Sequence, residues 1–125
     1  MMIHWFDAKT RVGQASLYLS NITLNVEASV PFEFAYKVQV GLNEDGNIVI
    51  EPLSKERVLR GDLDEYSLLN IKMAKSYSRI ASKELMRHLV EETGLKLDDK
   101  EALRFKTKWD EKSNLLIVLI KEVAQ

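Results

Sequence analysis

Basic side chains are concentrated in one short stretch of this 125-residue sequence, KMAKSYSRIASK, from Lys72 to Lys83. The stretch holds four Lys and Arg residues, one aromatic residue and no acidic residue, in a chain whose formal net charge is only -1. Clustered ammonium and guanidinium groups bind phosphate, and a helix that begins at Lys83 would add free backbone N–H groups. We therefore treat this stretch as a candidate phosphate-binding surface.

A continuous helix would place the cations of this region in one stripe, because they are three or four residues apart: Lys72, Lys75, Arg79, Lys83 and Arg87. The apolar residues argue against one helix, since those before Ser82 and those after it define two different faces. We expect the stripe to cross a strand, a loop and a helix start. The alternative is an ordinary solvated surface with partners such as Glu84 and Glu91, and Tyr77 is expected in the core rather than as a base-stacking platform.

Other chemistry has weaker support in the sequence. There is no cysteine, which excludes thiolate ligands and disulfides, and neither histidine has a second one at metal-ligand spacing. Asp62, Asp64 and Glu65 could hold a hard cation, but helix capping or a solvated connector explains them better. No Gly-rich phosphate loop or nucleophile elbow is present. We predict neither an enzyme nor a bound cofactor or metal.

Length and composition favour one globular domain. Hydrophobic residues make up 46% and charged residues 30% of the chain, too apolar for disorder and without the long uncharged run of a membrane span. The start of the chain lacks the basic region of a signal peptide, so the cytoplasm is the expected location. The near-neutral charge argues against indiscriminate coating of nucleic acid, and any basic site must be local.

The first half of the chain predicts a β-hairpin over Tyr36–Leu53. Apolar and polar residues alternate up to a turn in which Gly46 can adopt positive φ, and Pro52 is expected to end the second strand. Before it, Ser16–Asn25 reads as one or two strands, and Val26–Ala35 has room for about two helical turns at most.

The second half repeats this order of elements. An amphipathic helix is expected over residues 83–93, between an N-cap at Ser82 and a stop at Gly94. A second hairpin follows, with strands at Leu103–Trp109 and Leu115–Ile120. For Leu63–Met73 both strand and helix stay open, and the alternation favours a strand.

The two halves therefore predict an α+β fold of two β-α-β-β units packed as one pseudo-symmetric β-rich domain. SNITLN, EASVPFEF and YKVQVGLNEDGNIVI match YSRIAS, KELMRHLVEETG and RFKTKWDEKSNLLIVL in element order and loop position. The first unit covers residues 1–55, the connector 56–65 and the second unit 66–125.

The segment YSRIASKELMRHL before a hairpin, with GLNEDGNIVIEPL as a closing hairpin, resembles the swapped-hairpin units of the AbrB, MazE and MraZ group. The tandem arrangement is most similar to MraZ, and the resemblance covers Ser16–Leu53 and Ser76–Ile120. It implies a bacterial-type transcription regulator that binds double-stranded DNA with basic residues of the first strand and its exit loop. Arg79 and Lys83 match those positions, and Lys75 and Arg87 join them on charge alone.

The first unit departs from that pattern, because its corresponding stretch, Ser20–Asn25, carries no charge. The alternative function is a non-catalytic interaction or structural module. It would form a homodimer or bind a protein partner through an exposed sheet edge or the apolar segment Met1–Phe6.

Overall fold

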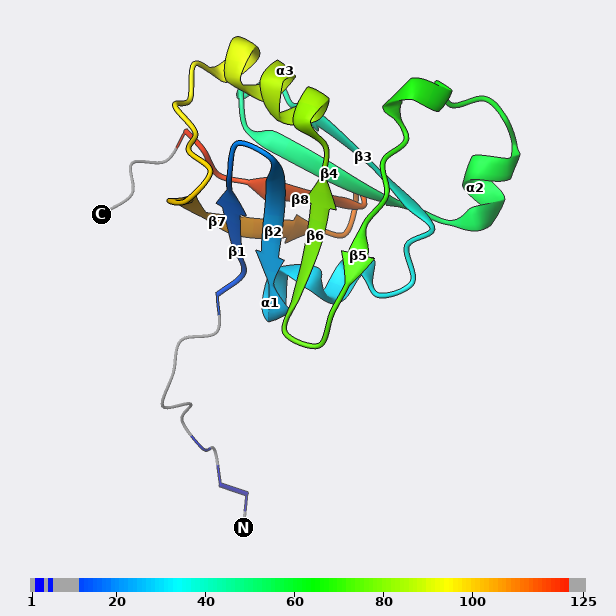
Figure 1. Cartoon of the computed structure of the whole chain (residues 1–125). Coiled ribbons are helices and arrows are strands. Elements are labelled where there is room, and N and C mark those ends of the chain that lie inside the picture. Colours follow the sequence, from blue (N-terminus) through cyan, green and yellow to red (C-terminus); the bar gives the residue numbers. More distant parts are fainter. Residues whose placement is uncertain (1, 4, 6–11, 122–125) are drawn as a thin grey trace.

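The computed structural model describes residues 2, 3, 5 and 12–121 and has the expected α+β class. One curled antiparallel sheet of eight strands forms most of it, in the order β3-β4-β8-β7-β1-β2-β6-β5 (Figure 1). The strands are β1 (Gln14–Leu17), β2 (Asn21–Asn25), β3 (Lys37–Leu42), β4 (Ile48–Leu53), β5 (Lys72–Met73), β6 (Tyr77–Ala81), β7 (Leu103–Asp110) and β8 (Leu115–Val118). The helical segments are α1 (Val26–Ser29), η1 (Val30–Phe32), α2 (Lys55–Leu59), η2 (Glu65–Ser67) and α3 (Lys83–Thr93).

Both predicted hairpins are present, as β3–β4 and β7–β8. In the first turn Gly46 has φ 81°, and the Asn43 side chain accepts hydrogen bonds from the N–H groups of Asp45 and Asn47, both at 3.0 Å. In the second turn Asn114 takes the left-handed conformation at φ 58°. The residues of the two turns therefore favour the pairing of β3 with β4 and of β7 with β8.

Pro52 does not end its strand, contrary to the sequence expectation. It pairs with Val38, and β4 runs on to Leu53. The N–H and C=O of Val38 both bond to Leu69 at 2.9 Å, so Val38 and Pro52 exchange no hydrogen bonds. On the other side, the β4–β8 ladder covers only Ile48 to Ile50. The missing N–H of Pro52 therefore leaves no ladder bond unmade.

Helix α3 has the predicted bounds and both predicted caps. The Ser82 hydroxyl accepts a hydrogen bond from the N–H of Leu85 at 3.1 Å, and Gly94 at φ 74° donates its N–H to the carbonyl of Val90 at 2.9 Å. Met86 and Leu89 are buried. The helix covers one end of the curled sheet (Figure 1).

The segment Leu63–Met73 is neither the predicted strand nor a helix. A single turn of 3-10 helix, η2, is followed by extended chain and the two-residue strand β5. Asp64 caps η2, since its carboxylate accepts a hydrogen bond from Tyr66 N–H at 3.0 Å. Leu69 forms an isolated bridge with Val38 in β3. The segment thus contacts the edge strand β3 and then continues into the other edge strand, β5. No local sequence pattern predicts this contact.

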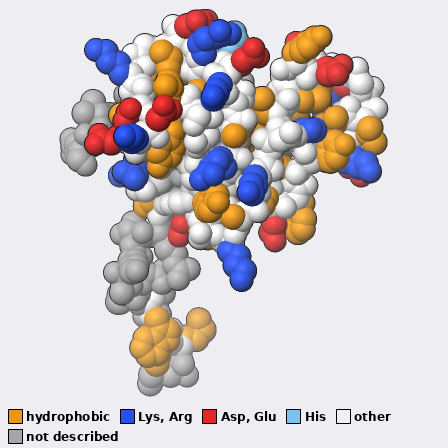
Figure 2. Space-filling view, viewed as in Figure 1, with side chains coloured by type: hydrophobic (Ala, Val, Ile, Leu, Met, Phe, Trp, Pro, Cys, Tyr) orange, Lys and Arg blue, Asp and Glu red, His pale blue; other side chains and the backbone are white. Residues whose placement is uncertain are grey.

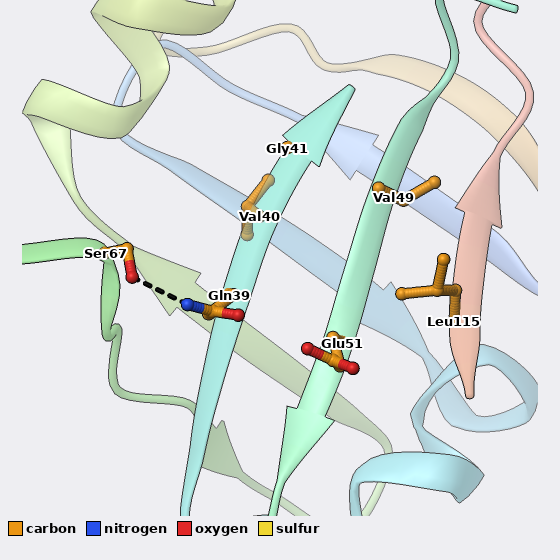
Figure 3. Close-up of a pocket in the computed structure, with 7 residues that line it drawn as sticks. All are labelled: Gln39, Val40, Gly41, Val49, Glu51, Ser67 and Leu115. Atoms are coloured by element: carbon orange, nitrogen blue, oxygen red, sulfur yellow. Dashed lines mark hydrogen bonds between the residues drawn. The ribbon is translucent and has the colours of Figure 1, made fainter. Parts of the chain in front are cut away.

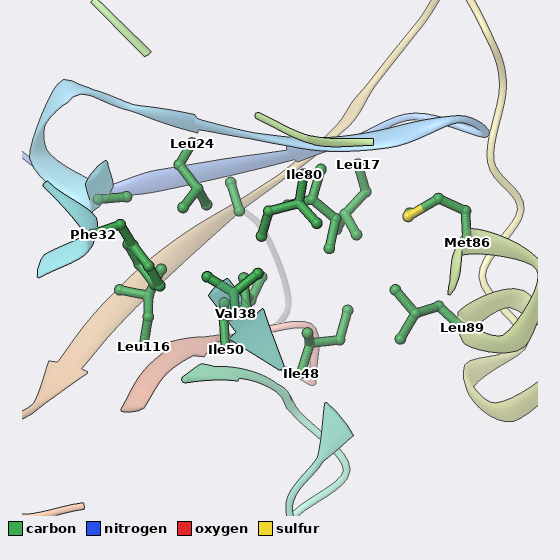
Figure 4. Packing of buried hydrophobic residues seen from close by; sticks show 14 residues of the cluster. Leu17, Leu24, Phe32, Val38, Ile48, Ile50, Ile80, Met86, Leu89 and Leu116 are labelled. Atoms are coloured by element: carbon green, nitrogen blue, oxygen red, sulfur yellow. The ribbon is translucent and has the colours of Figure 1, made fainter. Parts of the chain in front are cut away.

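The core lies inside the curl (Figure 4). Apart from β5, the strands contribute alternate residues to this core, as the period of two requires, and most of the inner positions are apolar. Because β2 pairs with β6 and β4 pairs with β8, the two halves of the chain share one core. Its fully buried large side chains include Leu17, Ile22, Leu24, Phe32, Val38, Ile48, Ile50, Ile80, Met86, Leu116 and Val118.

One polar pair is buried in this apolar interior. The hydroxyls of Ser29 in α1 and Ser78 in β6 are 2.7 Å apart, and Ser29 also donates toward the carbonyl of Asn25 at 2.7 Å. Ser78 is fully buried and Ser29 is 6% exposed. Each hydroxyl satisfies the other, so α1 is tied to β6 across 49 positions of sequence.

We expect Ser29→Ala to destabilise the fold by about 1–3 kcal/mol, because it leaves the Ser78 hydroxyl buried without its partner. The double variant Ser29→Ala/Ser78→Ala should lose less than the sum of the two single variants. Urea unfolding of all four proteins measures this coupling. Additive losses would show that the two hydroxyls do not depend on each other.

Candidate nucleic-acid interface

The predicted phosphate-binding residues lie on consecutive elements of one face. Lys75 is in the β5–β6 turn, Arg79 in the middle of β6, Lys83 at the first position of α3 and Arg87 one turn later, and all four are exposed. Figure 2 shows Lys and Arg side chains over α3, over the middle of β5 and β6, and near the turn below them. With Lys72 of β5, these residues form what we term the basic stripe.

The middle of the stripe belongs to a row of directly paired residues that crosses five strands. Lys72 pairs with Arg79, Arg79 with Thr23, Thr23 with Ser16, and Ser16 with Arg104 of β7. Directly paired residues point to the same face of a sheet, and their neighbours Ala15, Leu17, Ile22 and Ile80 point into the core. The row is therefore on the outer face, with cations at both ends and small hydroxyl side chains between them.

Arg79 is the best-oriented cation of the stripe. Its Nε donates a long hydrogen bond to the Thr23 hydroxyl at 3.4 Å, and its guanidinium carbon is 5.0 Å from the centre of the Tyr77 ring. The Thr23 hydroxyl in turn donates to Asn21 Oδ1 at 2.7 Å. Strand pairing and ring stacking together hold the side chain in place.

The expectation that Tyr77 lies in the core is wrong. Ser78 and Ile80 take the inner positions of β6, so Tyr77 is half-buried on the outer face beside Arg79. A cation lies over its ring, which leaves Tyr77 as a support for Arg79 rather than a free surface for a stacking base.

Carboxylate partners do not neutralise the stripe. Within residues 12–121, the single ion pair joins Arg57 and Asp62, at the end of α2. The hydrogen bond from Arg57 lowers the pKa of Asp62. The expected pairing of the stripe with Glu84 or Glu91 is not formed. Strands β1, β2, β5 and β6 contain no acidic residue, so the strand part of this face carries only positive charge, whereas α3 also carries Glu84, Glu91 and Glu92.

Sequence reasoning missed three cations of this face. The predicted DNA contacts are Lys75, Arg79, Lys83 and Arg87. The structure adds Lys72 of β5 and also Arg104 and Lys106, which are exposed on the part of β7 that pairs with β1. The alternation in Leu103–Trp109 indicates that these cations face outward. Only the β1–β7 pairing places them beside β1.

Acidic residues limit the site at the β1–β2 turn. The Leu19 N–H donates to the carbonyl of Asp98 at 3.0 Å, which brings the loop after α3 against this turn. Asp99 lines a hollow of about 380 Å³ with Lys83, Arg87, Leu19 and Val90. A polyanion following the stripe would meet these carboxylates if it turned toward β1.

A second hollow, of about 310 Å³, lies on the outer face of β3, β4 and β8 (Figure 3). Val49 and Leu115 give it apolar walls, and Glu51 is its one carboxylate. The Gln39 amide already donates to the Ser67 hydroxyl at 2.7 Å. With no cation in its lining, this hollow is unsuited to phosphate.

The apolar segment Met1–Phe6 falls partly outside the described residues. Of the residues that the structure describes there, Met2, Ile3 and Trp5 are exposed. Met1, His4 and Phe6 lie outside the described residues.

No group of three or more His, Cys, Asp or Glu side chains in the described part of the chain is arranged to hold a metal ion. Among residues 12–121 there is also no helix long and apolar enough to cross a membrane. No protein-family model, curated protein or solved structure matches this chain. The resemblance to the AbrB, MazE and MraZ group therefore stays a prediction from short motifs.

Like charges face each other at the centre of the stripe, since Lys72 is directly opposite Arg79. We expect Lys72→Glu to stabilise the fold by about 0.2–1 kcal/mol, because it replaces a cross-strand repulsion with an attraction. Urea unfolding at low salt measures the gain, which should shrink as salt rises. Lys72→Gln is the control for loss of repulsion alone. A destabilised Lys72→Glu would contradict the electrostatic account.

Proposed function

We propose that this protein binds double-stranded DNA through the basic stripe and acts as a transcription regulator of the AbrB-like kind. One observation carries the proposal. Five cations (Lys72, Lys75, Arg79, Lys83 and Arg87) follow one another on a single exposed face with no ion-paired carboxylate in the described chain. The β5–β6 part of this face carries no acidic residue, and the acidic residues Glu84 and Asp99 lie near its α3 end.

The length of the stripe suits a phosphate backbone. A strand rises about 3.3 Å per residue, so Arg79 and Lys83 are about 13 Å apart. Arg87 lies one helical turn farther, about 6 Å, and Lys75 lies beyond the other end of β6. The whole stripe spans up to about 30 Å, and one DNA strand places a phosphate every 3.4 Å or so along the helix axis. Each cation can therefore have its own phosphate.

The two-unit arrangement is part of the proposal, with β1 to β4 in the first unit and β5 to β8 in the second. Strand register supports it: Ser16 pairs with Thr23, and 56 positions later Lys72 pairs with Arg79. Counterpart strands also meet, as β2 with β6 and β4 with β8. The β1–β7 pairing has its counterpart in the bridge between Leu69, just before β5, and Val38 of β3.

Such a chain completes its own sheet, whereas a single unit would need a second chain. We therefore expect a monomer in dilute solution, measured by sedimentation equilibrium over a range of protein concentrations. A stable dimer at low micromolar concentration would contradict the expected monomer without excluding the two-unit arrangement.

DNA binding is tested by fluorescence anisotropy of a labelled 20-base-pair duplex of mixed sequence across a salt series. Wild type should bind at low salt and weaken steeply, because each phosphate contact contributes about 0.9 to the slope of log affinity against log salt. In the variant Lys75→Ala/Arg79→Ala/Lys83→Ala the slope should decrease by about 3 if all three cations contact phosphates, and by about 2 if Arg79 contacts a base instead.

The matched control is Lys55→Ala/Arg60→Ala/Lys112→Ala, which removes two lysines and one arginine from exposed positions off the stripe. It should keep the wild-type slope. If both triple variants lose affinity equally, net charge rather than the stripe governs binding. Failure of the folded wild type to bind at low salt would refute the function.

The second candidate is a module that binds a protein through apolar contacts. Val26, Val30 and Phe34 are four residues apart along α1, η1 and the chain that follows, and they are 48%, 65% and 89% exposed. Exposed apolar side chains in series suit association with a protein surface. Such association would be insensitive to salt, which distinguishes it from phosphate binding.

A further inference from the structure

Arg79 differs from the other cations of the stripe because its side chain is oriented by two neighbours. Its Nε–H points to Thr23 on the adjacent strand, and Tyr77 supports the guanidinium plane. Within the described chain, Lys75, Lys83 and Arg87 make no side-chain hydrogen bond, so they suit mobile contacts to phosphate. An arginine held in one orientation suits recognition of a base edge, where geometry decides specificity.

We infer that Arg79 reads guanine in the major groove, with Thr23 and Tyr77 as positioning residues. This inference rests on the DNA-binding function proposed above. A guanidinium has five N–H donors, and the bond from Nε to Thr23 uses one of them. The two terminal nitrogens form a fork that fits the O6 and N7 acceptors of guanine, which only the major groove presents.

The surroundings of Arg79 let a base edge approach. Thr23 and Ser16, its neighbours along the row on β2 and β1, are small and neutral, so they neither block a base pair nor repel the phosphates. A two-stranded β-ribbon is among the elements that the major groove admits. The β1–β2 hairpin beside Arg79 is not a free ribbon, because β1 also pairs with β7 and β2 with β6, so Arg79 reaches the groove from the outer face of the sheet.

The separation of Arg79 and Arg104 along the row is closer to the width of the major groove than to that of the minor groove. Arg104 lies at the far end of the row, three strand spacings from Arg79, which is about 14 Å along the sheet. The major groove is about 12 Å wide and the minor groove about 6 Å. With the outer face of the sheet against the DNA and Arg79 over the major groove, Arg104 and Lys106 face the phosphates on one side and Lys72 those on the other.

The test is selection of bound sequences by wild type and by Arg79→Lys from a pool of random 20-base-pair duplexes. Wild type should enrich a motif with a fixed G·C pair, and Arg79→Lys should lose that preference while keeping its salt slope. Replacing the selected guanine with 7-deazaguanine, which removes N7, should weaken wild type about tenfold and leave Arg79→Lys unchanged. Arg87→Lys is the matched control and should keep the motif.

Thr23→Val provides a second variant in case Arg79→Lys perturbs the strand. It keeps the shape and removes the acceptor of Nε, so the guanine preference should fall with the salt slope unchanged. An unchanged preference in Arg79→Lys, or wild-type binding with no enriched motif, would overturn the inference and leave DNA binding standing. Absence of any binding at low salt would overturn both. Tighter binding of the same sequence as duplex RNA would also overturn it, because RNA closes its major groove to side chains.

Discussion

The antiparallel pairing of β2 with β6 is the interaction on which the rest of the structure depends. It aligns Asn21–Asn25 with Tyr77–Ala81 and joins the two halves of the chain along five residue pairs. This register sends Ile22 and Ile80 into the core and turns Thr23 and Arg79 outward. A slip by one residue would exchange the two faces, burying a guanidinium and exposing the apolar residues. Core and candidate site thus depend on the same ladder.

Closure of the sheet explains how a small chain with short helices builds a buried interior. Most strands have apolar side chains on one face only. Because the sheet curls, these apolar faces meet, and Leu17, Val38 and Leu116 belong to one buried cluster. The Leu69–Val38 bridge joins the edge strand β3 to the chain just before β5 and takes up the N–H and C=O of Val38. Backbone groups at this point of the edge are therefore unavailable to another chain, which weakens the idea of partner binding through an open edge.

The outer surface of the sheet has two parts that differ in charge. One part, over β5, β6, β2, β1 and the start of β7, carries cations and small polar groups. The part over β3, β4 and β8 carries Val49, Leu115 and one carboxylate, Glu51. The near-zero net charge of the chain thus conceals a local positive field. At its centre, Lys72 of β5 lies directly opposite Arg79 of β6.

The sequence by itself determined the elements whose signals are local. The turns at Gly46 and Asn114, the Ser82 and Gly94 caps of α3 and the alternation in β7 act within a few residues, so both hairpins and the helix are predictable. The sequence likewise shows directly that Lys72–Lys83 carries basic residues and no acidic one.

Tertiary structure alone decided which strands meet. The inner and outer faces of β6, the outward turn of Tyr77, the approach of Arg104 to β1 and the irregular path of Leu63–Met73 all depend on partners distant in sequence. A strand carries the same alternation whichever neighbour it pairs with, and burial settles its register only when the whole sheet closes.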